Sequence, residues 1–146
     1  MQLQSHRSPS AVVLLAVIAL LSGCGGADEV TPRLPTADEA SANVILWVSN
    51  QSFDDESVRI TVRLDDRAVI DQDFDVEGQH NWISFPLVVG SGSHKLAVTS
   101  DSGAQRVDQL IIPKTGRRYA VVDYWREGRE LPHFEFQASD TPIGFD

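Results

Sequence analysis

Cysteine occurs once in the 146 residues, at Cys24. A chain with one cysteine forms no internal disulfide, so burial of apolar side chains must hold its folded part together. The sequence also lacks an apolar run long enough to cross a bilayer. Its N-terminal run, Ala11–Leu21, has eleven residues. As a helix it would be about 16 Å long, against about 30 Å for the hydrocarbon core of a membrane.

Positive charge is scarce. The chain has 12 lysine and arginine residues against 21 aspartate and glutamate residues, which gives a net charge of -9. Such a surface repels the phosphate backbone of a nucleic acid. We therefore expect no nucleic-acid partner, and a cationic ligand or a solubilising role for the charge fits better.

Signatures of catalysis and of cofactor binding are also missing. The segment Gly90–His94 is not Gly-x-Ser-x-Gly, and it has no Lys-Ser/Thr pair of a phosphate loop, so we predict a turn there. His80, His94 and His133 fall on different segments without the spacing of a zinc site. We expect no cofactor and no enzymatic activity.

Acidic residues alternate along one segment. Asp71, Asp73, Asp75 and Glu77 are spaced by two, which places them on one face of a strand. Several carboxylates could bind Ca²⁺. In an EF-hand loop that began at Asp73, however, Ser84 would stand at the twelfth position, where a glutamate is required. We expect a solvated face that discourages edge pairing and no metal site, and cation binding is the alternative.

The N-terminus has the pattern of a secretory signal peptide, because a start that carries Arg7 precedes the apolar run. The run closes on Leu21, Ser22, Gly23 and Cys24, which resembles the lipobox of bacterial lipoproteins. The resemblance implies cleavage before the cysteine and attachment of lipid to its thiol. Two or three acyl chains would hold the protein on a membrane for its lifetime, because each buried methylene contributes about 0.8 kcal/mol.

This pattern divides the chain into three parts: residues 1–23 as signal peptide, 24–42 as a lipidated flexible tether and 43–146 as one folded domain. Cleavage would leave 123 residues with a net charge of -10, because the removed part contains one arginine and no acid. We expect an extracytoplasmic protein that is lipid-anchored to a membrane. Gly25 after the cysteine resembles the outer-membrane lipoproteins of bacteria that have two membranes.

From residue 43 onward the hydrophobic period is two, which predicts about eight short strands separated by turns. Their expected ranges are 43–48, 57–65, 68–77, 82–88, 94–99, 107–112, 119–125 and 133–137. The first is apolar on both sides, which predicts burial of both faces, and Pro86 places the fourth at an edge or a bulge. This pattern is typical of an all-β, antiparallel two-sheet sandwich.

The segment Gly92–Val98 fits Gly-x-His-x-Leu-x-Val, which resembles a strand entry of immunoglobulin-like and fibronectin-like bacterial modules. The resemblance implies an immunoglobulin-like architecture. It implies no function, because that architecture serves many.

Aromatic residues give the most suggestive candidate site. In one phase of the strand 119–125, Tyr119, Asp123 and Trp125 share the outer face, where they could stack a sugar ring or an apolar partner. In the opposite phase, which is the more usual, Tyr119, Val121 and Trp125 face the core. The remaining large aromatic residues are expected in the core. They are Trp47, Trp82, Phe85, Phe134 and Phe136.

Together these patterns predict a membrane-anchored protein of the cell envelope whose sandwich is a binding or structural module. Its partner would be an envelope protein or a carbohydrate. Two alternatives stay open. An envelope hydrolase would need at least two of His80, His94, His133 and Asp123 beside a nucleophile in a concave pocket. The domain could also be a subunit of an envelope complex.

Overall fold

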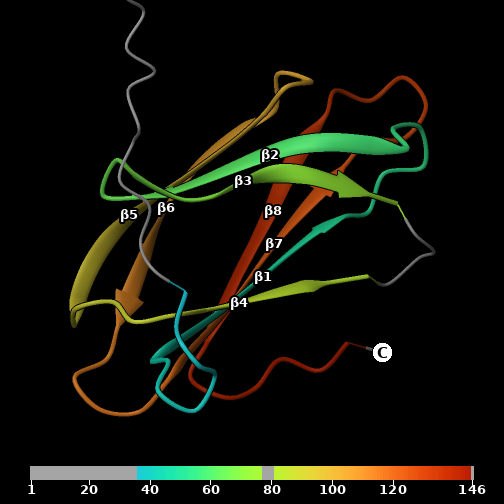
Figure 1. Cartoon of the computed structure of the whole chain (residues 1–146). Coiled ribbons are helices and arrows are strands. Elements are labelled where there is room, and N and C mark those ends of the chain that lie inside the picture. Colours follow the sequence, from blue (N-terminus) through green and yellow to red (C-terminus); the bar gives the residue numbers. More distant parts are fainter. Residues whose placement is uncertain (1–35, 77–80, 146) are drawn as a thin grey trace, which may run out of the picture.

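The computed structural model describes residues 36–76 and 81–145 (Figure 1). This part of the chain forms eight strands. They are β1 (Val44–Asn50), β2 (Ser57–Leu64), β3 (Arg67–Asp75), β4 (Ile83–Leu87), β5 (Gly92–Ser100), β6 (Gln105–Ile112), β7 (Arg118–Trp125) and β8 (His133–Ser139). In these residues no helix is long and apolar enough to cross a bilayer. The predicted signal peptide and the lipobox residues, together with Glu77 and His80, lie outside the described residues.

The strands form two sheets of four, in the orders β4-β1-β7-β8 and β3-β2-β5-β6. The predicted all-β two-sheet sandwich is thereby confirmed. All pairings are antiparallel except that of β1 with β7, which is parallel and aligns Val44 with Arg118 and Asn50 with Tyr124. The immunoglobulin-like resemblance is compatible with this fold and stays a prediction.

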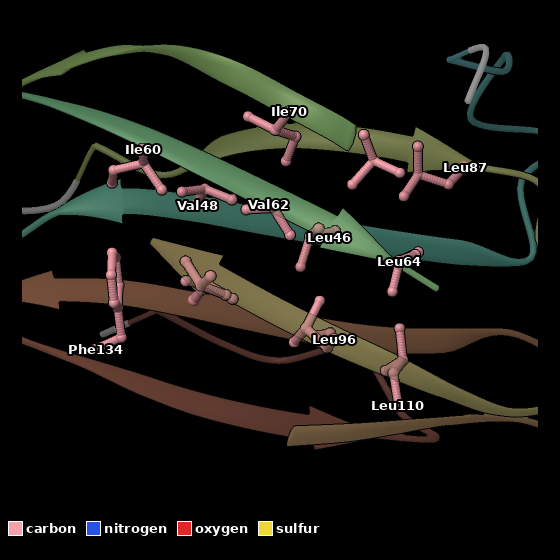
Figure 2. Close-up of a cluster of buried hydrophobic side chains, with 14 of the residues drawn as sticks. Leu46, Val48, Ile60, Val62, Leu64, Ile70, Leu87, Leu96, Leu110 and Phe134 are labelled. Atoms are coloured by element: carbon pink, nitrogen blue, oxygen red, sulfur yellow. The ribbon is translucent and has the colours of Figure 1, made fainter. Parts of the chain in front are cut away.

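The core lies between the sheets and is built by alternate residues of each strand. Figure 2 shows Leu46 and Val48 of β1 in one cluster with Ile60 and Val62 of β2. Burial of each such side chain contributes about 1.5–3 kcal/mol, so this cluster can stabilise a domain that has no disulfide.

Strand β1 is buried on both faces, as the sequence predicted. Leu46 and Val48 face the core and are inaccessible, while Ile45 on the opposite face is 1% exposed and Ser49 is also buried. The strand lies inside the sheet between β4 and β7, and on its outer face Ser49 is bonded to Asp123 of β7. Strand β4 lies at the edge of the same sheet, as Pro86 predicted.

The segment 36–42, which the sequence analysis placed in the tether, contacts the sandwich. The Ala37 amide donates to the Pro86 carbonyl at 2.9 Å, so this segment extends along the free edge of β4. The Arg117 side chain donates to the carbonyls of Ala42, at 2.9 Å, and Glu39, at 2.7 Å. The segment reaches the sandwich at the end where β1 begins.

The opposite end of the sandwich carries the loops 51–56 and 126–132. The Tyr124 hydroxyl, at the end of β7, donates to Asp55 Oδ2 at 2.6 Å, and Arg126 Nη1 donates to Asp55 Oδ1 at 2.9 Å. The Phe53 amide donates to the Arg126 carbonyl at 3.0 Å. These bonds tie the two loops together, and Phe53 is exposed beside them.

Candidate functional site

Strand β7 has the phase that places Tyr119, Asp123 and Trp125 on the outer face of its sheet. Ala120 and Tyr124 are inaccessible and belong to the core. The more usual phase, in which the odd-numbered side chains face the core, is wrong for this strand. The parallel register decides the phase, because it sets Ala120 beside a core residue of β1.

The other aromatic residues divide between the two faces. Phe134 is buried in the core, and Phe85 and Phe136 pack against it, partly buried. The expectation that Trp47 and Trp82 lie in the core is wrong. Trp47 stands between two core residues of β1, so the alternation of the strand points it outward. The Trp82 side chain reaches Asp123 on the same outer face.

Asp123 is the polar centre of this face. Its Oδ1 accepts hydrogen bonds from Ser49 Oγ at 2.6 Å and from Trp82 Nε1 at 2.8 Å. Gln51 Nε2 in turn donates to Ser49 Oγ at 2.9 Å. Burial raises the pKa of Asp123, as does the charge of Glu135 on β8, while the two hydrogen bonds oppose this shift. The carboxylate is therefore held by two donors in a poorly solvated place.

Trp82, which is bonded to this carboxylate, begins a chain of contacts with three further aromatic rings. The rings of Trp47 and Tyr119 stack with their centroids 6.0 Å apart and their planes at 14°. Phe145 stacks on Trp82 at 4.2 Å and 23°, and it meets Trp47 edge-to-face at 5.4 Å and 75°. Figure 1 shows the C-terminal segment passing below β4 toward the end marked C. We name Trp47, Trp82, Tyr119 and Phe145 with Asp123 the outer aromatic cluster.

Trp125 lies apart from this cluster. It is six positions along β7 from Tyr119, which is about 20 Å along a strand, so the two rings form no common platform. Trp125 lines a depression of about 230 Å³ together with His133 of β8 and acidic residues that include Glu127 and Glu130. Its Nε1 has no hydrogen-bond partner among the described residues.

The acidic strand is paired with a neighbouring cation. Arg59 of β2 lies 2.9 Å from Asp71 and 3.7 Å from Asp73, and the hydrogen bond that Arg59 donates to Asp71 raises the pKa of Arg59. Asp73 and Asp75 are exposed, while Phe74 between them is buried, which is the predicted alternation. In the ranges 36–76 and 81–145, no three potential metal ligands lie close enough together to hold an ion.

The two described histidines lie at opposite ends of the sandwich. His94 Nδ1 is 2.6 Å from Asp65 Oδ2, and His94 Nε2 is 2.8 Å from the Gly90 carbonyl. His133 pairs with Trp125 at the far end of β7, and its Nδ1 is 3.3 Å from the Leu131 carbonyl. The structure does not bring these two side chains together in one pocket.

Sequence reasoning missed Ser49 and Phe145 as members of the site. The alternation of β1 could have placed Ser49 on one face with Trp47, but the sequence did not show that this face adjoins Asp123. Nothing in the local pattern around Phe145 indicates where its ring lies. No family model, curated protein or solved structure matches this chain.

Proposed function

We propose that this protein is a lipid-anchored, extracytoplasmic binding module whose ligand surface is the outer face of β4-β1-β7-β8. One observation supports the ligand surface above the rest. The outer aromatic cluster gathers aromatic rings and a half-buried carboxylate on the side of the sheet away from the core. Tryptophan and tyrosine side chains of this kind dominate the energetics of binding sites.

The carboxylate supports a role in recognition. Both described hydrogen bonds to Asp123 use Oδ1, so Oδ2 is left for a donor on a ligand. A ligand that covered the rings would also exclude water from this oxygen and strengthen such a bond. An envelope polypeptide or a carbohydrate offers both an apolar face and hydrogen-bond donors.

Photo-crosslinking in intact cells tests the ligand surface. A photoreactive amino acid at Gln137, exposed on β8 and aligned with Val121 on the outer face, should give adducts. The matched control is Gln109, equally exposed on the other sheet, which should give none. Adducts from Gln109 alone, or from neither position, would contradict the assignment.

The anchor rests on the resemblance of residues 21–24 to a lipobox and is tested separately. The full chain, expressed in a bacterium supplied with labelled palmitate, should incorporate label and sediment with membranes. The variant Cys24→Ala should do neither. An unmodified Cys24 thiol in the mass spectrum of the native protein, or a membrane-bound Cys24→Ala variant, would contradict the anchor.

A further inference from the structure

We infer that the space against Trp47 and Trp82 which the Phe145 ring fills, named here the cleft, is a receptor for an aromatic side chain on an extended polypeptide, and that Phe145 is a resident occupant which a partner segment displaces. This inference rests on the proposed function, because it names the ligand class of the same face. Phe145 itself is the observation that identifies the class. Its ring lies between the two indoles, and it is still 37% exposed.

The two walls of the cleft are held in place by contacts that do not involve Phe145. Trp82 is fixed by its hydrogen bond to Asp123, and Asp123 is fixed by Ser49. Trp47 lies on the buried strand β1 and stacks on Tyr119 of β7. A cleft whose walls are preorganised loses little conformational entropy when a ring enters it, so it can accept a second ring after the first leaves.

The occupant is attached much more weakly than the walls. The segment after β8 is fixed near its start, where Arg118 pairs with Asp140 at 2.9 Å and the Thr141 amide donates to Ser139 Oγ. Beyond that point, none of the hydrogen bonds found in the described part of the chain involves residues 142–145. Only the partial burial of the Phe145 ring and its two aromatic contacts hold this end of the segment. A competing segment therefore has to replace only the ring contacts of Phe145, and no hydrogen bond of residues 142–145 described here has to break.

The shape of the cleft favours a flat aromatic ring over a sugar. Trp82 presents its face to Phe145, whereas Trp47 meets the same ring nearly at a right angle. Stacked and edge-to-face contacts are the two arrangements that pairs of aromatic rings prefer. A pyranose needs several hydrogen-bond partners around its rim.

The test uses the mature chain and a labelled hexapeptide, Thr-Pro-Ile-Gly-Phe-Asp, which has the sequence of residues 141–146. Fluorescence anisotropy should show saturable binding to the Phe145→Ala variant. Binding to the wild-type chain should be about tenfold weaker, because a cleft that its own tail fills nine-tenths of the time has that much lower apparent affinity. Phe53→Ala is the matched control, since Phe53 is exposed at the distant loop, and it should behave as the wild-type chain.

Two further measurements identify the recognised group. Replacing phenylalanine by alanine in the hexapeptide should abolish binding to Phe145→Ala, as should Trp82→Ala in the same background. Circular dichroism of each variant verifies that it is folded. The inference is overturned if the wild-type and Phe145→Ala chains bind the peptide equally or not at all, or if the alanine peptide binds as well. It is also overturned if chitotriose binds Phe145→Ala while the peptide does not. In each of these cases adducts from Gln137 would still support the proposed function.

Discussion

At the scale of single residues, His94 has the most sharply defined electrostatic role. Its two ring nitrogens face two acceptors, Asp65 Oδ2 and the Gly90 carbonyl, so the ring satisfies both only when it is protonated. The hydrogen bond that His94 donates to Asp65 raises the pKa of His94, and the same bond lowers the pKa of Asp65. The pair joins the β2–β3 turn to the start of β5.

This pair predicts a stability that depends on pH. Because the folded pKa of His94 is raised, its contribution is fully present below the unfolded value of about 6.5 and is lost as the pH rises through the folded pKa. The lowered pKa of Asp65 keeps the partner charged down to acidic pH. His94→Asn should lower the free energy of unfolding by roughly 1 kcal/mol at pH 5.5 and by less at pH 8.5.

Urea unfolding of both chains at the two pH values measures this difference. His133→Gln is the control, because the one hydrogen-bond contact of the His133 ring among the described residues is the long one to the Leu131 carbonyl, and it should leave stability unchanged at both pH values. If the free energy of unfolding that His94→Asn loses became larger as the pH rose, the role given to the His94–Asp65 pair would be contradicted.

Asp123 predicts a pH dependence in the same direction, because its pKa is also raised in the folded chain. Burial raises its pKa, so the native state holds the proton more tightly than the unfolded state, and wild-type stability gains from this group as the pH falls. Asp123→Asn keeps an oxygen that accepts from Ser49 and Trp82 but removes the half-buried charge. The variant should be more stable than the wild-type chain at pH 7, by roughly 0.5–1 kcal/mol, and the difference should shrink at pH 4.5. Tryptophan fluorescence during urea unfolding reports both values, and a less stable variant at pH 7 would refute the prediction.

Part of this residue-level picture could be predicted from the sequence. Period two marked Tyr119, Asp123 and Trp125 as one face of a strand, and the structure keeps them on one face. It could not decide which face, because both phases of this strand carry apolar residues. The positions of Trp47 and Trp82 depend on pairings between strands that are far apart in the chain, which no local pattern encodes.

At the scale of elements, the β2–β3 hairpin shows how local chemistry sets the register. Asp65 and Asp66 both have positive φ, 47° and 65°, as a two-residue turn matching the twist of its strands requires. Aspartate tolerates this region better than most residues, and glycine tolerates it best. The predicted turn and the predicted strand starting at Ser57 follow from this local sequence.

Substitution at Asp66 tests this interpretation of the turn. Asp66→Gly should raise the free energy of unfolding by about 0.5 kcal/mol, because relief of the backbone outweighs loss of the exposed ion pair with Lys95. Asp66→Val should lower it by about 1–2 kcal/mol. Thermal unfolding measures both, and Lys95→Gln, which removes only the ion pair, is the control. If the glycine and valine variants were equally stable, the backbone at residue 66 would not be strained.

Element order illustrates where sequence reasoning ends. The edge position of β4 was predictable from Pro86, because proline lacks the amide that an inner strand must donate. The parallel pairing of β1 with β7 was not predictable. An alternating pattern tells which side of a strand is apolar, but it contains no information on which other strand lies beside it.

At the scale of the whole molecule, the excess of acidic residues acts on stability. A net charge of -9 produces repulsion across a compact domain, which salt screens by shortening the Debye length from about 30 Å at 10 mM to about 8 Å at 150 mM. We expect the melting temperature at pH 7.5 to rise by about 4 °C over this range, which corresponds to roughly 1 kcal/mol.

Differential scanning calorimetry measures this rise. Near pH 4.7, the isoelectric point expected from the sequence, the same change of salt should have little effect, because the net charge is then close to zero. A melting temperature that fell with added salt at pH 7.5 would show that specific ion pairs outweigh the general repulsion.

The parallel neighbour of β1, strand β7, is the seventh of the eight described strands. A polypeptide that emerged from a narrow channel with its N-terminus leading would have β1 lined on one side only by β4 until residue 125 had passed. The inner sheet partner that completes its hydrogen bonds would still be in transit. In any chain that emerged in this way, the order of strands would delay the closure of this sheet until β7 had appeared.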